Sequence, residues 1–363
     1  MRFVGEPLLS EVRAKLLDWY DANRRDLPWR RTRDPYQILV AEYLLQRTRI
    51  ASGIPYFERF VRRFPSLRDL ANASLDEVLA QWEGLGFYGR ARNLHAAARA
   101  ILDRFSGEVP HSYDELESLP GMGPYTAGAV ASIAFGLPVA AVDGNVTRVI
   151  SRLFRIHEAM GGAIARRRIK ALADRLVSPN RPGEFNQALM DLGATICTPT
   201  SPACDRCPLE RDCLARAAGE ERLLPIARGS RSPPIVPVAF ALVASNGRVL
   251  LRRRPQGALL GGLWSLPGGE ISRDDDVSEA LAALVREQAG LTVDVGPECA
   301  RVDRVFSHRK WSGAIYRCTP RRPPRNHNNT QWLTRDEALR LPLVPFHRTA
   351  IERGSLGPGL ERK

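Results

Sequence analysis

The sequence predicts a multidomain protein in which an all-α domain is followed by a smaller α/β domain. Residues up to about 222 carry helix-capping patterns and no long alternating strand pattern. After residue 237 the pattern changes to apolar runs that are separated by a turn signal. A segment rich in proline, glycine and serine, about residues 223–237, lies between the two halves and is typical of a linker.

Helices in the first half are indicated by their start signals. Ser74 with Glu77 three residues later forms a capping box before an apolar face. Ser112 with Glu115 predicts a second, shorter helix. The stretch 119–142 has no charged residue, but it is rich in small residues and is broken by prolines. A membrane span needs about 20 strongly apolar residues, so this stretch predicts a buried core helix at roughly 125–135.

The second half has the signals of a mixed α/β domain. Asn246-Gly247 separates the apolar run 238–245 from the run 248–252, which predicts a β-hairpin. Residues 278–288 have the pattern of a helix and residues 314–318 that of a further strand. We therefore expect a domain of about 115 residues that spans 238–352.

Four cysteines, Cys197, Cys204, Cys207 and Cys213, lie in a C-x6-C-x2-C-x5-C run. Four thiolates this close in sequence indicate a zinc site or an iron–sulfur cluster. The spacing has only one C-x2-C pair, and its wider loops suit a cubane, in which each thiolate reaches a different iron. The N-terminus does not resemble a signal peptide, which argues against disulfides and predicts a cytoplasmic protein.

The net charge is +13 and the isoelectric point is about 10.0. All but four of the 53 basic residues are arginines. An excess of this size favours a polyanionic partner such as nucleic acid, although a merely soluble basic protein would show it too.

A glycine-containing turn follows the second capped helix, at Leu119-Pro120-Gly121-Met122-Gly123. Its two glycines permit positive φ, and the amides at the start of the next helix can bind a phosphate. This turn, the stretch Val142-Asp143-Gly144-Asn145-Val146 and the cysteine run resemble, in that order, the helix-hairpin-helix DNA glycosylases of the endonuclease III superfamily. Within it the chain resembles the MutY family of adenine glycosylases. Matching stretches also lie at 27–30, 34–36, 84–94 and 185–193, so the resemblance covers about residues 8–350.

The resemblance implies a domain organisation and partners. Residues 1–222 would form a helical DNA glycosylase domain, with a six-helix part at about 29–136 and a cluster part at about 1–28 and 137–222. Residues 238–352 would form a Nudix-like domain, followed by a tail at 353–363. The four cysteines would hold a [4Fe-4S] cluster. The expected partner is double-stranded DNA with an adenine opposite 8-oxoguanine or guanine, bound by a monomer without a membrane and, in a bacterium, at the nucleoid.

The resemblance also assigns catalytic residues, namely Glu42, Tyr125, Asp143 and Asn145. Glu42 matches the acid that protonates adenine, and Asp143 matches the carboxylate that stabilises the positive sugar. The apolar neighbours of Glu42 predict burial and a raised pKa. Relatives that also cut the strand have a lysine where this chain has Tyr125, so we expect a glycosylase without an efficient lyase step.

Residues that match DNA contacts are spread over the first half. The adenine must be flipped out of the duplex to reach a pocket, and Phe87 and Tyr88 match an aromatic wedge near the lesion. Arg47 replaces the usual glutamine of the family and resembles thymine-removing relatives. The full set is Arg25, Arg30, Arg47, Thr48, Leu85, Phe87, Tyr88, Gly121, Gly123 and Gln187.

The second half resembles the Nudix fold through the stretch 261–270. Residues 283–290 lack two of the acids that hold metal in Nudix hydrolases, so we expect this domain to bind rather than hydrolyse. The residues Phe306, Ser307 and His308 match the loop that recognises 8-oxoguanine.

Three other functions remain open. The first is a thymine or uracil mismatch glycosylase, which Arg47 favours and the loop 306–308 disfavours. The second is a catalytically silent module that binds damaged DNA, which Glu42, Tyr125 and Asp143 disfavour. The third is a nucleotide pyrophosphohydrolase, which the incomplete Nudix stretch disfavours. A redox role for the cluster also remains open.

Overall fold

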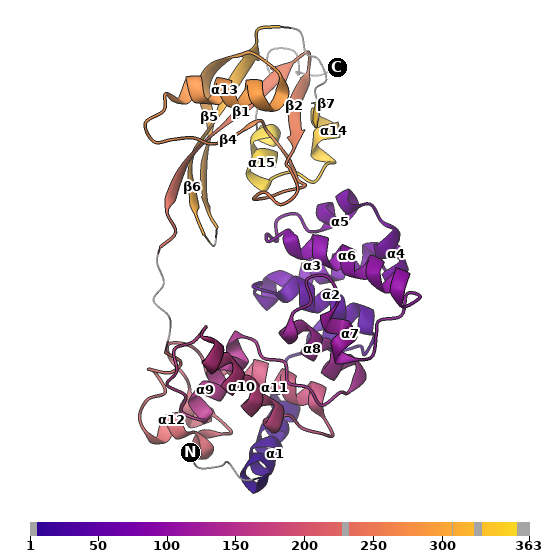
Figure 1. Cartoon of the computed structure of the whole chain (residues 1–363), viewed down its shortest axis with the longest axis vertical. Coiled ribbons are helices and arrows are strands. Elements are labelled where there is room, and N and C mark those ends of the chain that lie inside the picture. The colour runs from indigo at the N-terminus through magenta and orange to yellow at the C-terminus, as the bar shows by residue number, and fades with distance from the viewer. Residues whose placement is uncertain (1–5, 227–231, 307, 323–328, 354–363) are drawn as a thin grey trace. The chain divides into compact units, whose positions relative to one another are not determined.

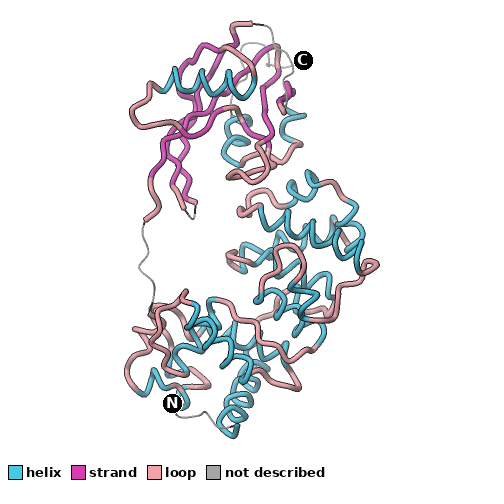
Figure 2. The backbone as a smooth tube through the Cα atoms, viewed as in Figure 1, coloured by secondary structure: helices cyan, strands magenta, loops and turns pink. Residues whose placement is uncertain are grey.

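The computed structural model describes residues 6–226, 232–306, 308–322 and 329–353. Its contacts divide the chain into two compact units, residues 1–73 with 89–230 and residues 74–88 with 231–363. Among the described residues the strands all lie in the second unit, and the first is built of helices and loops (Figures 1 and 2). The predicted succession of an all-α and an α/β part is confirmed.

The first unit contains most of the helices (Figure 1). In chain order they are α1 (Glu6–Asn23), the 3-10 turn η1 (Pro28–Arg30), α2 (Pro35–Leu45), α3 (Ile50–Arg63), α4 (Leu67–Asn72), α6 (Gly89–Arg104), α7 (Tyr113–Glu117), α8 (Pro124–Phe135), α9 (Gly144–Leu153), α10 (Ala163–Leu176), α11 (Pro182–Thr195), the 3-10 turns η2 (Cys204–Arg206) and η3 (Glu210–Asp212), and α12 (Leu214–Ala217). Within the described ranges, none of the helices combines the length and the apolar character that a membrane crossing needs.

Two groups of helices build this unit. Helix α2 packs against α3, α6 and α8, and α4 packs against α6. Helices α1, α9, α10 and α11 share a separate hydrophobic core, in which Leu16, Ile150 and Leu189 are buried. The predicted core helix is α8, which begins with Pro124 at its first position and ends at Gly136 with a φ of 69°.

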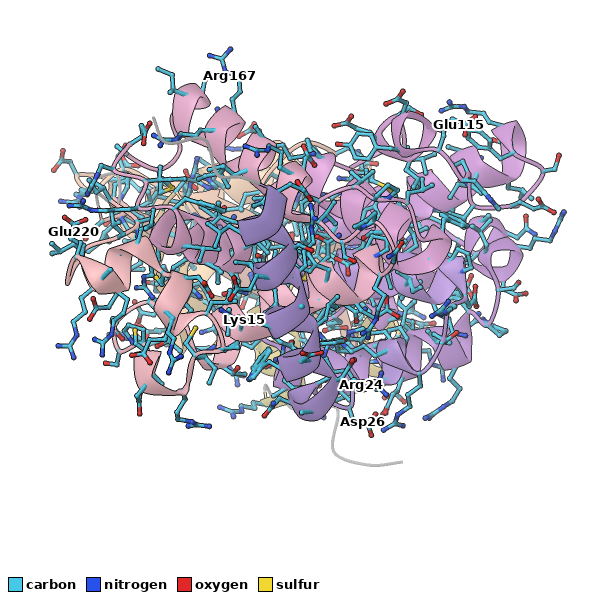
Figure 3. The ribbon with its side chains drawn as sticks, turned by 90° about the horizontal axis from the view of Figure 1, so that it is seen from below. Lys15, Arg24, Asp26, Glu115, Arg167 and Glu220 are labelled. Carbon is cyan, nitrogen blue, oxygen red and sulfur yellow. The ribbon has the colours of Figure 1, made fainter. Side chains whose placement is uncertain are left out.

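The segment with the four cysteines contains only short turns, so it depends on neighbouring helices for its position. Lys15 on α1, labelled in Figure 3, donates a hydrogen bond to Asp212 at 2.9 Å. Leu209 joins the core of α1, α9, α10 and α11. These two contacts attach the cysteine segment to the core formed by α1, α9, α10 and α11.

In its described residues, the second unit has a seven-stranded mixed sheet and four helices. Its elements are α5 (Leu75–Gln81), β1 (Ile235–Ser245), β2 (Arg248–Arg253), β3 (Trp264–Ser265), β4 (Gly268–Glu270), α13 (Val277–Ala289), β5 (Val293–Val305), β6 (Lys310–Pro320), β7 (Thr330–Thr334), α14 (Arg335–Leu339) and α15 (Pro345–Arg353). Strands β1 and β6 pair in parallel, and the other pairs of named strands are antiparallel.

Several local predictions for this unit are confirmed. The capping box of Ser74 and Glu77 opens α5. Asn246 and Gly247, with φ of 50° and 71°, join β1 to β2 as the predicted hairpin turn. The helix expected at 278–288 is α13, and its buried Leu281 and Val285 pack into the core of the sheet.

The longest strand pair was only partly predicted. The strand expected at 314–318 is the centre of β6, which is longer. Its partner β5 was not predicted, because most of its side chains are exposed and it shows little apolar alternation. These two strands are joined by residues 306–309, which include the predicted recognition loop.

Candidate active site and cysteine cluster

Glu42 lies in the middle of α2 and is 7% exposed. Its neighbours Leu39, Val40 and Leu44 are buried with it, because α2 is covered on nearly every face. The carboxylate atom Oε2 has no hydrogen-bond partner among the described residues. The predicted burial of this acid is confirmed.

Burial raises the pKa of Glu42 to about 7. A hydrogen bond with the Tyr125 hydroxyl lowers this pKa, the negative charge of Asp143 raises it and the positive charge of Arg30 lowers it. A carboxyl group with a pKa near 7 keeps its proton in a large fraction of molecules at neutral pH. Glu42 can therefore act as a general acid.

Asp143 is the N-cap of α9 and lines the same cavity as Glu42. Its Oδ1 accepts a hydrogen bond from the N–H of Val146 at 2.7 Å, and its Oδ2 accepts one from Asn145 Nδ2 at 3.1 Å. Burial raises the pKa of Asp143, whereas these hydrogen bonds lower it because they stabilise the carboxylate. The start of the helix favours a negative charge as well.

The four predicted catalytic residues line one cavity of about 150 Å³. Tyr125, the second residue of α8, hydrogen-bonds Glu42 and places its hydroxyl 3.8 Å from the sulfur of Met190. Burial and the nearby acids raise the pKa of Tyr125 well above its usual value, so its hydroxyl stays protonated. Four predicted DNA-binding residues line this cavity too: Arg25, Arg30, Thr48 and Gln187.

One wall of the cavity is an ion-pair group around Asp191, which is 1% exposed. Arg25 donates from Nε to Asp191 Oδ1 at 2.9 Å, and Arg30 donates to Oδ2 at 2.7 Å and to Oδ1 at 2.9 Å. Burial opposes ionisation, but the hydrogen bonds from Arg30 and Arg25 hold the pKa of Asp191 below its usual value. The two arginines are thus fixed at the pocket by a buried carboxylate.

A larger cavity of about 850 Å³ adjoins this wall and shares Arg25, Arg30 and Gln187 with it. It is lined by six arginines, which are Arg24, Arg25, Arg30, Arg31, Arg33 and Arg181. Arg31 pairs with Asp26 and Arg181 with Asp21, so much of this charge is balanced. The smaller cavity, which is lined by both predicted catalytic carboxylates, is the candidate active site.

Arg90 holds the turn that follows α2, the helix that contains Glu42. Its buried Nη1 donates to the carbonyl of Leu44 at 2.6 Å, to that of Gln46 at 2.5 Å and to Thr48 Oγ1 at 3.0 Å. Arg47 lies between these acceptors with a φ of 60°, which is uncommon for a residue with a side chain. The position of Arg47 is therefore set by the residues on each side of it.

The predicted phosphate-binding turn joins α7 to α8. Gly121 has a φ of 72°, and a Cβ there would lie 2.3 Å from the side chain of Asn93, so no other residue fits. Gly123 is exposed at the N-cap of α8. Tyr43, next to the catalytic acid, donates to the carbonyl of Pro120 at 2.5 Å and so connects α2 to this turn.

The aromatic wedge expected at Phe87 and Tyr88 lies in the second unit, and its two residues differ. Phe87 is 48% exposed and has a φ of 48°. Tyr88 is buried, and its hydroxyl accepts a hydrogen bond from the N–H of Gly84 at 3.2 Å. Phe87 is thus available to a ligand, and Tyr88 braces the loop that contains Leu85.

Cys197, Cys204, Cys207 and Cys213 line a single cavity of about 30 Å³. Within the described ranges no three acidic, histidine or cysteine side chains are arranged around a point that suits one metal ion. Four thiols around one cavity can hold either a zinc ion or an iron–sulfur cluster. Burial raises the pKa of Cys207 to about 12, so its thiolate form requires an adjacent cation.

Two arginines of α9 bind the cysteine segment. Arg152 is 2% exposed and donates to Cys197 Sγ at 3.2 Å and to the carbonyls of Thr198 and Pro199. Arg148 donates to the carbonyl of Cys197 at 2.7 Å and to Asn145 Oδ1 at 2.8 Å. Asn145 in turn binds Asp143, so hydrogen bonds run without a break from the cysteine segment to the candidate active site.

The recognition loop lies between β5 and β6. Phe306 and His308 are described and flank the turn, whereas Ser307 lies outside the described residues. The Phe306 ring packs edge-to-face against Trp311, with centroids 5.0 Å apart. Gln288 lies in the incomplete Nudix stretch. It accepts a hydrogen bond from the N–H of Gly268 at 2.8 Å and donates one to the carbonyl of Gly268 at 3.3 Å.

Sequence reasoning missed the residues that support this site, namely Arg90, Arg148, Arg152 and Asp191. Each is a charged side chain whose partners are mostly backbone carbonyls or distant residues. Asp191 had the one usable signal, since it is the single charged residue of the stretch 185–193.

Two family models match the chain. The HhH-GPD superfamily base excision DNA repair protein matches residues 40–193, and the NUDIX domain matches residues 238–353. Among curated proteins, the adenine DNA glycosylase of Homo sapiens is 36% identical and the alignment covers 94% of this chain and 72% of that protein. The adenine DNA glycosylase of Schizosaccharomyces pombe is 31% identical, with 85% and 82% covered.

Solved structures resemble the helical part. A thermostable thymine-DNA glycosylase is 32% identical with a TM-score of 0.53, and covers 58% of this chain and 98% of its own. An endonuclease III in complex with DNA is 24% identical with a TM-score of 0.51, and covers 60% and 99%. The second likeness concerns the fold alone, and it agrees with the helix-hairpin-helix architecture predicted here.

Proposed function

The chain belongs to the adenine DNA glycosylases, which are helix-hairpin-helix enzymes of base excision repair with a C-terminal Nudix-like domain, and we propose that it removes adenine paired with 8-oxoguanine or guanine and leaves an abasic site. The observation that carries the proposal is the pairing of Glu42 and Asp143 in one small cavity. The two carboxylates differ in environment, which suits an acid and a charge stabiliser.

Glu42 is the acid in this mechanism. Adenine leaves poorly as an anion, so a proton on the flipped base lowers the barrier to cleavage of the glycosidic bond. The pKa of about 7 supplies that proton at neutral pH, and Tyr125 orients the carboxyl group through its hydrogen bond. Oε2 has no hydrogen-bond partner within the described part of the chain, so it can hydrogen-bond the base.

Asp143 is the charge stabiliser. As the bond breaks, positive charge develops on the deoxyribose, and a carboxylate beside it lowers the energy of that state. Val146 and Asn145 orient the carboxylate, and Arg148 orients Asn145 in turn. Water then completes the hydrolysis and gives an abasic site.

The strand remains intact in this mechanism because no amine is present at the site. A lyase step needs a lysine that forms a Schiff base with the sugar. Tyr125 occupies the matching position, and the sequence contains no lysine between Lys15 and Lys170.

DNA binding is assigned to loops of both units. The turn at Gly121 and Gly123 offers backbone amides to a phosphate, and Arg47 and Thr48 lie in the turn after the acid helix. Phe87 and Leu85 are candidates for insertion beside the flipped base, and Arg25, Arg30 and Gln187 for contacts inside the pocket.

The Nudix-like domain is proposed to read the opposite base. Phe306, Ser307 and His308 would contact 8-oxoguanine, while the replacement of two acids by other residues makes hydrolysis of a pyrophosphate unfavourable. The relatives that match nearly the whole chain are adenine glycosylases, which supports a role for this domain in the same reaction.

A [4Fe-4S] cluster is proposed for Cys197, Cys204, Cys207 and Cys213. Such a cluster would cross-link the cysteine segment, and the basic side chains Arg206 and Arg211 on the loops between the cysteines would then face phosphates. The N–H of Arg152 that reaches Cys197 Sγ is suited to a thiolate that shares its charge with iron.

One other substrate has specific support. Arg47 replaces the family's usual glutamine, and a thymine-DNA glycosylase resembles the helical part. The test is single-turnover excision on duplexes with adenine opposite 8-oxoguanine, adenine opposite guanine, thymine opposite guanine and uracil opposite guanine. We expect cleavage of the first two, visible only after alkali, and none in the matched Glu42→Gln variant. Excision of thymine but not adenine would contradict the proposal.

A further inference from the structure

Glu270 ends β4, directly after the two glycines of the Nudix-like stretch. Its Oε1 accepts a hydrogen bond from Arg309 Nη1 at 2.5 Å and another from Trp311 Nε1 at 2.7 Å. Burial disfavours the charged form, but the hydrogen bonds from Trp311 and Arg309 hold the pKa of Glu270 below its usual value. One carboxylate oxygen of Glu270 therefore binds both Arg309 and Trp311, which follow the recognition loop in the sequence.

Both partners of Glu270 belong to the structure of that loop. Phe306 donates its N–H to the carbonyl of Arg309 at 2.8 Å, which closes the turn after the last strand pair, Val305 with Lys310. The Phe306 ring rests against the indole of Trp311, which is 1% exposed. Glu270 thus holds one end of the turn by binding Arg309. It also holds Trp311, against which the Phe306 ring packs.

Glu270 itself stands on a rigid strand. β4 pairs with β1, with Phe240 opposite Gly268 and Val238 opposite Glu270. Gly268 has a φ of 123°, and a Cβ there would lie 2.3 Å from the carbonyl oxygen of Ala239, so the strands approach closely. Gln288 fixes Gly268 from the other side. The carboxylate is therefore a fixed point relative to the sheet.

Loss of the carboxylate would leave its partners in an unfavourable state. The Trp311 N–H is buried, and a buried donor without an acceptor costs free energy. Arg254 lies over the Trp311 ring at 5.7 Å, and Glu270 is the acid that interacts with its charge. Removing Glu270 would therefore take this negative charge away from Arg309 and Arg254, and Phe306 and Arg309 would lose their set positions.

We propose that Glu270 is a positioning residue that sets the preference for the base opposite adenine: through Arg309 and Trp311 it holds the two ends of this turn, Phe306 and Arg309, without contacting DNA itself. The inference rests on the proposed function, because it assumes that this turn reads 8-oxoguanine. The role proposed for Glu270 requires neither a metal ion nor a pyrophosphate. The expected defect is one of specificity, since Glu270 lies in the second unit and the catalytic carboxylates lie in the first.

The test measures single-turnover excision of adenine opposite 8-oxoguanine and opposite guanine for wild type, Glu270→Ala and Glu270→Gln. We expect Glu270→Ala to lower the ratio of the two rates about tenfold, the scale of a lost hydrogen bond to a charged group, while the rate opposite guanine stays within about twofold. Glu270→Gln keeps an acceptor for Trp311 and should retain part of the ratio. Glu279→Gln, an exposed glutamate of α13, is the matched control and should change neither rate.

The outcomes separate the inference from the function on which it rests. If wild type shows no preference, or if Ser307→Ala with His308→Ala leaves the preference intact, the proposed reading of 8-oxoguanine fails and the inference fails with it. If that double variant loses the preference but both Glu270 variants keep it, only the inference fails. Equal losses on both substrates would show general destabilisation and would also overturn it. Arg309→Gln, which removes one of the two contacts, should lower the ratio without lowering thermal stability as much as Glu270→Ala.

Discussion

Arg148 donates a hydrogen bond from Nε to the backbone carbonyl of Cys197 at 2.7 Å. The same guanidinium binds Asn145 Oδ1 and the carbonyl of Gly193, and Asn145 binds the carboxylate of Asp143. A Cβ on Gly193 would lie 2.7 Å from the Cβ of Asn145, so the helices meet closely at this point. We therefore expect a shift of the cysteine segment to reach Asp143, the proposed stabiliser of the developing sugar charge.

Replacement of Arg148 by glutamine should lower the single-turnover excision rate about tenfold or more. The reason is the loss of charged hydrogen bonds, each worth about 1.5–3 kcal/mol, that orient Asn145 and its neighbours. The measurement is excision at saturating enzyme, with iron and sulfide content measured in parallel. Arg167→Gln is the matched control, because Arg167 is an exposed arginine of α10 (Figure 3). An unchanged rate in Arg148→Gln would show that the connection has no catalytic role.

The excision rate should fall as the pH rises above about 7. Glu42 acts in its protonated form, and its pKa of about 7 means that this form is present below pH 7 and is lost above it. A plot of the logarithm of the single-turnover rate against pH should approach a slope of about −1 on the alkaline side. A rate that is constant from pH 6 to about pH 9 would contradict the assignment of Glu42 as the acid.

Glu42→Gln should abolish excision and also stabilise the fold at alkaline pH. The pKa of Glu42 is higher in the folded than in the unfolded state, so ionisation favours unfolding once the pH exceeds the usual value of 4.5. The penalty grows through the folded pKa and reaches on the order of 3 kcal/mol well above pH 7. Thermal unfolding at pH 5 and at about pH 8.5 should show a gain for the variant only at the higher pH. A variant less stable at both values would mean that the carboxylate is not strained by burial.

Arg152→Met should impair retention of the proposed [4Fe-4S] cluster. The variant removes the hydrogen bonds that Arg152 donates to the carbonyls of Thr198, Pro199 and Leu224. It also removes the hydrogen bond from Arg152 to Cys197 Sγ. Loss of a hydrogen bond to a cluster sulfur also moves the reduction potential to more negative values. Iron and sulfide per chain and the visible absorbance are the readouts. Arg155→Gln, which breaks an exposed ion pair with Glu220, is the control. It should keep both the iron and sulfide content and the visible absorbance.

Wild-type enzyme should not be trapped on its substrate by borohydride, because Tyr125 has no amine with which to form a Schiff base. Excised duplex should remain uncut until it is treated with alkali. Tyr125→Lys places an amine at the same cavity and should form a trapped complex on a duplex with a preformed abasic site. Trapping of the wild type would identify another nucleophile and would sink the proposal of a monofunctional enzyme.

Short-range signals account for what the sequence predicted correctly. Ser74 with Glu77, Asn246 with Gly247 and the apolar surroundings of Glu42 each act over a few residues, and each has the expected structure. The supporting residues depend on distant partners instead. Arg30 and Asp191 are 161 positions apart, and their convergence depends on the packing of whole helices. Strand β5 escaped prediction because an exposed strand leaves little hydrophobic pattern.

The hydrogen bond between Tyr43 and Pro120 has a consequence for how DNA is examined. Tyr43 follows Glu42 directly on α2, so its hydrogen bond to Pro120 holds the proposed acid at a fixed distance from the proposed phosphate-binding turn. If this turn binds a phosphate as proposed, a base can reach Glu42 only when its nucleotide lies a set number of bonds from that phosphate.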